Sequence, residues 1–416
     1  MADPLCGILA TITLWLFLLG KWRMDTPSLW MAAYVCMYAV TMTFNATWNS
    51  GTALNFFRTA TAALVLYIVV HNVMCNIDDL KWFYWLTALL GIIVSLTGIF
   101  VLIGQWADNF AKVLNVVSVL GSGPNTMNSW AFVQVMCLAI ALAWWFQSPA
   151  AVHRALTCAV LGVGIALSLS RTAYSCLVLI LLFAVVGARR RHAKRVIVIV
   201  FSVVGAIWLA IGQLSEAVPQ AMTLAGEKLN TYQSDLNDTR LVALTIDPLM
   251  AWLRQSPVVW IVGDGSSQQH NLLTNCLWMT GLLGTFLMVG YHTALFRKSL
   301  KLWRAERKTY SAPATLGSVF FALILVMLLD DLLTNLRNHS SGVAYTFAVL
   351  AGGLSSAAAW SNCGHSTTTG HAAHPNYRYR IRAGGRLSPS QALPARNPAP
   401  SLLDGRVTMN PDLSRD

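Results

Sequence analysis

The chain has 416 residues, of which 56% are hydrophobic and only 11% are charged, and its net charge is +12. This composition excludes a soluble globular protein and is typical of a protein that crosses a membrane several times. The positive charge alone could indicate a nucleic-acid-binding protein. The lysines and arginines lie between apolar runs, however, so they encode topology and no nucleic-acid partner is expected.

Apolar runs long enough to cross a bilayer core of roughly 30 Å recur along the chain. They predict about eleven transmembrane helices, at 5–20, 29–48, 59–75, 82–104, 125–146, 152–169, 172–188, 195–213, 271–296, 312–331 and 339–360. The sequence therefore predicts an all-α fold, a polytopic membrane helical bundle that occupies residues 1–360. The first run is expected to be a retained helix and not a cleaved signal peptide, because its positive charges follow it.

The basic residues predict the orientation of the bundle. Alternate threading of the eleven spans puts 22 of the 29 lysines and arginines on one face, including the clusters RRRHAKR (189–195) and RKSLKLWRAERK (297–308). The positive-inside rule makes this face cytoplasmic. We therefore expect the N-terminus outside and the C-terminus inside.

The residues 214–270 form the longest polar interruption between apolar runs, and the threading places this loop outside. Within it, residues 235–255 have the pattern of an amphipathic helix, which Pro248 is expected to kink or to split in two. The fold is thus expected to carry one large outer loop that contains short helices.

Two other features of the sequence predict no site. The tail 361–416 is rich in Ser, Thr, Pro, Gly and Arg, so we expect a disordered cytoplasmic extension. The eight cysteines are scattered without a CxxC pair. They are interpreted as packing residues and not as ligands of a metal or partners in disulfides.

Three ionisable side chains that are expected on the outer face form a candidate site. Arg171 follows Ser170 at the outer end of a helix, Arg240 lies in the loop, and His270 precedes Asn271 where the loop closes. A guanidinium group matches phosphate oxygens, and an imidazole is the usual general base near neutral pH. The structural alternatives are an arginine that snorkels at a helix end and a histidine that caps a helix. Taken together, the residues predict a transferase with an anionic leaving group and no metal.

Four motifs carry a family resemblance. They are LSLSRTAY (167–174), DTR (238–240), SPVVWIVGDG (256–265) and QHNLLTNCLWMTGLLG (269–284). In this order, the chain resembles the superfamily of O-antigen ligases and Wzy-type polysaccharide polymerases.

The resemblance implies a glycosyltransferase of the bacterial inner membrane whose outer face is periplasmic. Its substrates would be a glycan linked to undecaprenyl diphosphate and an acceptor glycan, which is either a lipid A core or a second lipid-linked repeat. The resemblance implies that Arg171 and Arg240 hold the diphosphate and that His270 is the catalytic base, with Ser170 and Asn271 in support. It implies neither a metal nor a cofactor.

Several alternatives stay open on the sequence. A ligase and a polymerase share the lipid donor and differ in the acceptor, which the sequence does not name. A polysaccharide transporter or flippase is a second possibility, but it should carry ionisable residues in the middle of its spans, and the helix centres here are almost free of charge. A non-catalytic assembly subunit is the third, and it predicts that no single polar substitution on the outer face abolishes function.

Overall fold

The computed structural model describes residues 11, 23–74, 77–106, 126–147, 151–167, 171–187, 197, 205, 246–265, 272–308, 317–333 and 341–363. The chain divides into two units, Met1–Thr368 and Thr369–Asp416, and all of the described residues belong to the first. Every regular element in these ranges is helical, and the described residues form no strand. The expected all-α class is therefore confirmed for the described part of the chain. Most of the expected spans 5–20 and 195–213, and most of the tail from Ser361, lies outside the described residues.

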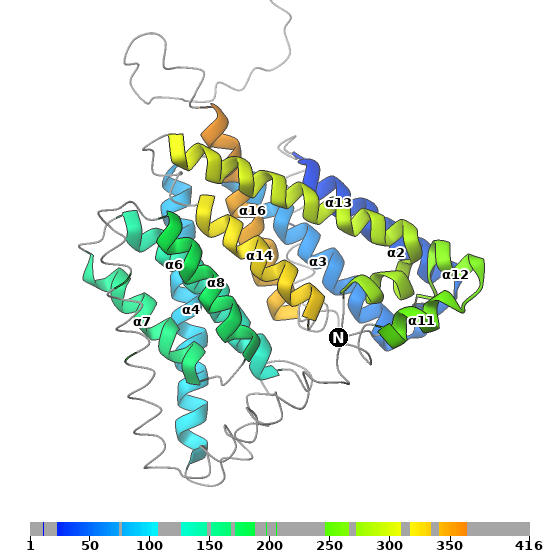
Figure 1. The fold of residues 1–416 in the computed structure, drawn as a ribbon, viewed down its shortest axis with the longest axis horizontal. Helices are drawn as coiled ribbons and strands as arrows, with labels where there is room; N and C mark the ends of the chain where they lie inside the picture. Colours follow the sequence, from blue (N-terminus) through cyan, green and yellow to red (C-terminus); the bar gives the residue numbers. More distant parts are fainter. Residues whose placement is uncertain are drawn as a thin grey trace, which may run out of the picture. The chain divides into compact units, whose positions relative to one another are not determined.

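Eleven α-helices and one short 3-10 helix make up the described part of the chain (Figure 1). They are α2 (Thr26–Phe44), η1 (Thr47–Asn49), α3 (Gly51–Val73), α4 (Ile77–Trp106), α6 (Thr126–Gln147), α7 (Val152–Leu167), α8 (Arg171–Gly187), α11 (Asp247–Leu253), α12 (Pro257–Val262), α13 (Leu272–Lys308), α14 (Gly317–Leu333) and α16 (Ser341–Cys363). All of the α-helices except α11 and α12 coincide with apolar runs that the sequence predicted. The other two are short helices within residues 214–270, as expected for the loop, and Pro248 lies in the first turn of α11.

The apolar helices support the membrane class that the composition predicted. Among the described residues, four helical stretches are long and apolar enough to cross a membrane, and these are Gly51–Val73, Asp79–Gly98, Ser129–Phe146 and Leu272–Arg304. Large apolar side chains of α4, such as Trp82, Leu86 and Ile93, are exposed. Such side chains are stable when they face lipid.

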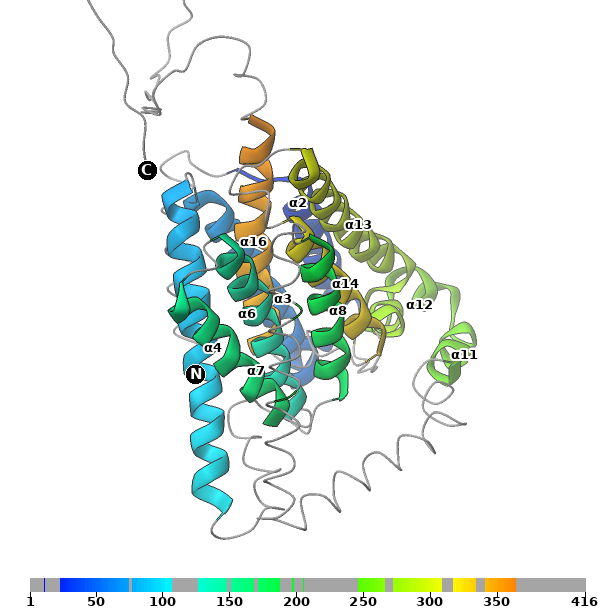
Figure 2. The same cartoon turned by 60° about the vertical axis from the view of Figure 1, so that its left-hand side comes forward.

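Helix α6 lies inside the bundle and packs against α4, α7, α8, α14 and α16 (Figures 1 and 2). Its residues between Ser129 and Phe146 are almost all buried, as a helix that is apolar on every side requires. The Ser95 hydroxyl donates to Oε1 of Gln134 over 2.9 Å within this core, and the Trp130 indole donates to the carbonyl oxygen of Val94. Helix α4 therefore supplies hydrogen-bond partners for Oε1 of Gln134 and for the indole of Trp130.

Helix α2 is bounded by two polar residues. Asp25 is its N-cap, and its carboxylate accepts the Ser28 amide at 3.0 Å while the Ser28 hydroxyl accepts the Asp25 amide. Asn45 is the C-cap at the other end. The 19 residues of the helix span about 28 Å, close to the thickness of a bilayer core. Asp25 and Asn45 therefore mark opposite ends of the bundle.

Helix α13 is bent at Gly281, whose φ of 65° and ψ of −163° are not helical. Leu272 and His292 line the same cavity, although twenty residues of straight helix would separate them by about 30 Å. The short arm (272–280) therefore folds back beside the long arm (282–308). This differs from the single uninterrupted span that the sequence predicted at 271–296.

Candidate functional site

The residues that the sequence nominates lie mostly outside the described part of the chain. This holds for Ser170, Arg240, His270 and Asn271. Arg171 is the first residue of α8, as expected for a residue at a helix end, although its side chain is not described. The structure does describe the chain on both sides of His270. The described residues end at Gly265 and resume at Leu272.

The opposite end of α8 is fixed by aromatic contacts at the same end of the bundle as Lys298. The Phe183 ring lies 5.9 Å from the Trp303 ring, centroid to centroid, and Trp303 is in the long arm beyond Lys298. Twelve residues of helix separate Phe183 from Arg171, which corresponds to about 18 Å. Arg171 therefore lies at the end of α8 that is farther from Trp303 and Lys298.

Two glycines hold the loop against the bend of α13. Gly263 has a φ of 76°, and a Cβ at this position would lie only 2.5 Å from the carbonyl carbon of Met279. In the same way, a Cβ at Gly281 would overlap the carbonyl oxygen of Ile261 and lie 2.6 Å from the amide nitrogen of Val262. Both residues combine a positive φ with a ψ near 180°, a conformation that is essentially restricted to glycine. The two backbones therefore meet directly, and we call this contact the glycine contact.

Three hydrogen bonds reinforce the glycine contact. The Asp264 amide donates to the carbonyl oxygen of Trp278 over 2.7 Å, which gives a partner to a carbonyl at the end of the short arm. The Thr41 hydroxyl donates to the carbonyl oxygen of Val262 over 2.7 Å, and Nδ2 of the Asn45 side chain donates to the carbonyl oxygen of Gly263 over 3.1 Å. The GDG segment is thus fixed to the Asn45 end of α2 and to the short arm.

Helix α11 is attached to the same arm through tryptophans. The Trp278 indole donates to the carbonyl oxygen of Pro248 over 3.0 Å. Trp252 is buried, and its carbonyl oxygen accepts the indole N–H of Trp260. The described part of the loop, residues 246–265, therefore packs on the helix whose first residue comes two positions after His270.

A cavity of about 290 Å³ lies between the two arms of α13. Its lining is mostly apolar and consists of Leu272, Leu273, Cys276, Thr285, Met288, Val289, His292, Thr293, Phe296 and Leu328. Nδ1 of His292 lies 2.9 Å from the carbonyl oxygen of Met288 in its own helix. A concave apolar site of this kind can bind a hydrocarbon chain. It begins at Leu272, next to the chain segment that carries His270 and Asn271.

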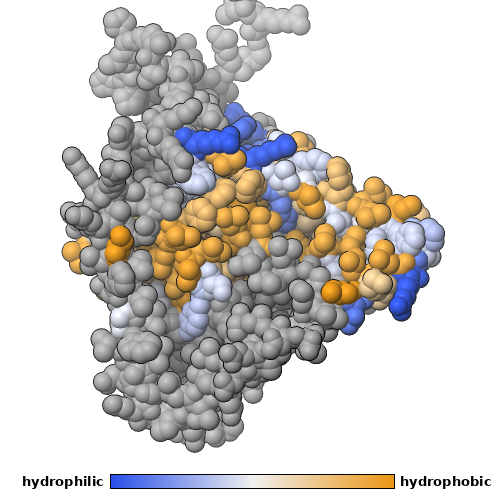
Figure 3. Space-filling model, in the orientation of Figure 1, coloured by the Kyte–Doolittle hydropathy of each residue, from blue (hydrophilic) through white to orange (hydrophobic). Residues whose placement is uncertain are grey.

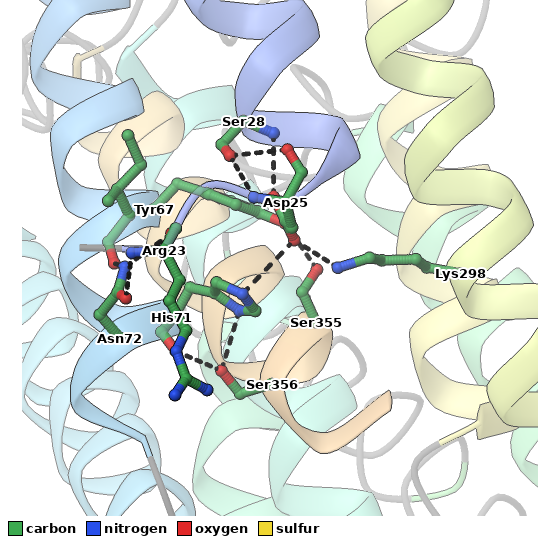
Figure 4. Close-up of polar contacts among 10 residues, drawn as sticks. Arg23, Asp25, Ser28, Tyr67, His71, Asn72, Lys298, Ser355 and Ser356 are labelled. Atoms are coloured by element: carbon green, nitrogen blue, oxygen red, sulfur yellow. Dashed lines mark hydrogen bonds and ion pairs between the residues drawn. The ribbon is translucent and has the colours of Figure 1, made fainter. Parts of the chain in front are cut away.

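The other end of α2 holds a network of charged and polar side chains that the sequence did not predict (Figure 4). Oδ2 of Asp25 accepts a hydrogen bond from the Lys298 ammonium of the long arm and another, of 2.7 Å, from the Tyr67 hydroxyl of α3. Nε2 of His71 lies 3.7 Å from the same oxygen and forms an ion pair with it when the imidazole is protonated. One carboxylate thus joins α2, α3 and α13.

Helix α16 completes this network through two serines. The Ser355 hydroxyl lies 2.8 Å from the Tyr67 hydroxyl, and the Ser356 hydroxyl donates to the carbonyl oxygen of His71 over 2.8 Å. Burial raises the pKa of Asp25, but Lys298, His71 and Tyr67 together lower it by more, so the pKa lies below its ordinary value of 3.8. The sequence did signal part of this arrangement, because DTPS (25–28) has the N-cap and early proline of a helix start.

The loop and the basic residues lie at opposite ends of α2. Val262 and Gly263 contact the Asn45 end, whereas Lys298 contacts the Asp25 end, where the Arg23 amide also donates to the side chain of Asn72. Alternate threading of α2, α3 and α13 predicts this separation.

The described residues contain no group of three or more His, Cys, Asp or Glu side chains that could hold a metal ion. Comparison with models of protein families and with curated proteins finds no match for the chain.

Proposed function

We propose that the protein is an inner-membrane glycosyltransferase that moves a glycan from undecaprenyl diphosphate to an acceptor hydroxyl on the periplasmic face, and so ligates or polymerises a surface polysaccharide. The observation that carries the proposal is the apolar cavity between the arms of α13. Its wall begins at Leu272, two residues after His270. A lipid-linked donor needs an apolar site for its chain close to the reacting groups, and here the cavity begins beside the proposed base in the sequence.

The proposed roles follow from the charge that develops during transfer. Arg171 and Arg240 bind the diphosphate, since each guanidinium offers planar donors to phosphate oxygens. His270 accepts the proton of the acceptor hydroxyl while the hydroxyl oxygen forms a bond to the anomeric carbon of the donor glycan. The bond from that carbon to the phosphate oxygen breaks, and its electron pair leaves with undecaprenyl diphosphate. Ser170 and Asn271 orient the arginine and the histidine. Attack opposite the leaving group inverts the anomeric configuration.

The glycine contact supports this arrangement mechanically. General-base catalysis requires the base to lie within hydrogen-bond distance of the proton it accepts. The glycine contact and the Asp264 hydrogen bond fix the loop to the short arm, so the described chain on both sides of residues 266–271 belongs to one packed unit.

The position of the charged network around Asp25 bears on the alternative that the protein is a transporter or flippase. Such proteins carry ionisable residues near the middle of the membrane. Asp25 is the N-cap of α2, and Lys298 contacts it there, so this network lies at a helix end. The location favours a structural role for these charges over a path for a transported substrate. A non-catalytic assembly subunit is distinguished by the experiment below.

The test is transfer of glycan in cells that carry single substitutions at equal protein abundance. His270→Ala is expected to lower transfer by about 10²–10⁴-fold, the usual contribution of a general base. Arg171→Ala and Arg240→Ala should each lower it by roughly 10²–10³-fold, in line with the loss of one electrostatic contact to developing charge. His153→Ala on α7 and Arg58→Ala on α3 are matched controls, because both side chains are exposed and belong to no proposed role. Normal transfer by His270→Ala would show that the proposed base is wrong.

The glycan made by a deletion strain separates the two transferase classes. Surface glycan limited to single repeats identifies a lost polymerase, whereas long chains that remain unattached identify a lost ligase. If all three site variants transfer normally and only deletion has an effect, the protein is an assembly subunit.

A further inference from the structure

Helix α11 exposes an apolar face. Ile246, Met250 and Leu253 are 44–47% exposed, and their spacing of four and then three residues places them on one side of a helix. The opposite side carries Trp252, which is buried against Trp260 at a ring distance of 6.3 Å. The helix is therefore attached through its tryptophan, and its aliphatic side chains point away from the protein.

Helix α12 repeats this pattern. Val258 is 67% exposed and Ile261 is 51% exposed, and their spacing of three residues puts them on one face. No residue of this helix is buried. The two helices thus present five exposed aliphatic side chains, which we call the loop apolar face.

The loop apolar face adjoins an exposed apolar side of α13. The backbone of Ile261 packs against Gly281, and the next turn of α13 exposes Leu282, Leu283 and Phe286. These three residues lie in the stretch Leu272–Arg304, which is long and apolar enough to cross a membrane. Figure 3 shows apolar residues extending from α13 toward the end of the molecule where α11 and α12 lie. The loop apolar face therefore continues the exposed apolar surface of a helix that is long and apolar enough to cross a membrane.

We propose that the loop apolar face is embedded among the acyl chains of the adjacent bilayer leaflet, so that α11 and α12 form an interfacial membrane anchor. Contiguous apolar surfaces of this kind are unusual in contact with water, and short amphipathic helices bind at the level where headgroups meet acyl chains. The polar residues Arg254, Gln255 and Ser256 connect the two helices and are exposed. They lie at the headgroup level, where an arginine can keep its charge in water.

The anchor fixes how deep the glycine contact lies. Ile261 is one residue from Val262, which belongs to the glycine contact, so burial of α12 in the leaflet sets the height of the GDG segment relative to the headgroups. The embedding of α11 and α12 does not depend on the proposed glycosyl transfer. It would hold equally for a transporter or an assembly subunit.

The test uses the full chain in vesicles of phosphatidylethanolamine and phosphatidylglycerol, with single spin labels in a background whose native cysteines are replaced. Labels are placed by Leu253→Cys, Val258→Cys and Ile261→Cys. Phe286→Cys serves as the lipid-facing reference, and Gln255→Cys, between the two helices, serves as the water-facing control. Collision rates are then measured with oxygen, which concentrates in lipid, and with a neutral nickel chelate, which stays in water.

The labels at Leu253, Val258 and Ile261 are expected to match Phe286, with frequent oxygen collisions and few nickel collisions, while Gln255 shows the reverse. Nickel access at Val258 and Ile261 equal to that at Gln255 would overturn the proposal. Exclusion of both reagents would overturn it as well, because protein would then cover the face. If the cysteine-free background does not fold, benzoylphenylalanine at Val258 in the native chain should crosslink to lipid, and crosslinking to protein alone contradicts the anchor.

Discussion

Gly263 and Gly281 meet backbone to backbone, one at the end of α12 and the other at the bend of α13. Neither position has room for a Cβ, and each has a positive φ of 65–76°. The contact joins segments that are eighteen residues apart in the sequence. It is the point at which the loop, the short arm and the Asn45 end of α2 come together.

Replacing Gly281 with alanine should therefore lower the free energy of unfolding of the protein. The backbone conformation alone costs about 1–3 kcal/mol for a residue with a Cβ, and the overlap with the Ile261 carbonyl adds to it. The measurement is the free energy of unfolding in mixed micelles titrated with a denaturing detergent. Gly51→Ala is the matched control, since a Cβ there meets nothing within 4 Å. Equal stability of the two variants would contradict the glycine contact.

A double-mutant cycle should show that Asp25 and Lys298 interact energetically. Asp25→Asn keeps an N-cap side chain but removes the charge, and we expect it to cost about 1.5–3 kcal/mol, the range for hydrogen bonds to charged groups. Lys298→Met keeps the aliphatic stem of the side chain. Because the two groups contact each other, the double variant should lose less stability than the sum of the single variants, with a coupling of roughly 0.5–3 kcal/mol.

The control for this cycle is Lys301→Met, an exposed lysine on the same arm. It should combine additively with Asp25→Asn. Additivity for Lys298→Met as well would mean that the ion pair contributes nothing to stability.

The contribution of Asp25 to stability should also depend on pH. Its pKa in the folded protein is lower than the ordinary 3.8, so the folded state favours the charged carboxylate and binds fewer protons than the unfolded state. The stabilisation is therefore fully present above pH 3.8 and is lost as the pH falls from there through the lowered pKa. Unfolding of the wild type and of Asp25→Asn should be compared across this range. The stability difference between them should shrink as the pH falls, and a difference that grows would reverse the assignment.

The sequence located the helices well because apolar length is a local property. The runs at 125–146 and 152–169 correspond closely to α6 and α7. The count of basic residues also predicted that the cluster containing Lys298 and the loop lie on opposite faces. In the structure Lys298 contacts Asp25 at one end of α2, and the loop contacts Asn45 at the other. Both inferences need only hydropathy and the alternation of spans.

The bend of α13 was not evident because TGLLG lies within an uninterrupted apolar run. A glycine there is compatible with a straight helix, and the contact that accompanies the bend is with Ile261, which is distant in the sequence. The network around Asp25 was missed for a similar reason. Tyr67, His71 and Ser355 are ordinary helix residues until α3 and α16 pack together, so no local pattern identifies them. The roles of Arg171, Arg240 and His270 remain predictions from sequence.

Filling the cavity between the arms of α13 should impair use of a lipid-linked donor if the proposed function is correct. Val289 lines the cavity and is half exposed, so Val289→Trp can add bulk there without replacing a fully buried side chain. Changes in an apolar pocket typically alter selectivity by 1–3 kcal/mol, so we expect kcat/KM for the undecaprenyl donor to fall by roughly tenfold or more. A donor with a short prenyl chain should be affected less, because it places less hydrocarbon in the cavity.

Leu283→Trp provides the comparison for this variant. Leu283 is similarly exposed on the same arm but does not line the cavity, so its replacement should leave both donors unaffected. The two tryptophan variants differ in position and not in chemistry, which isolates the cavity from general effects on the lipid-facing surface. Equal loss with long and short donors in Val289→Trp would locate the defect in folding or in the acceptor, and the cavity would then have no role in binding the lipid chain.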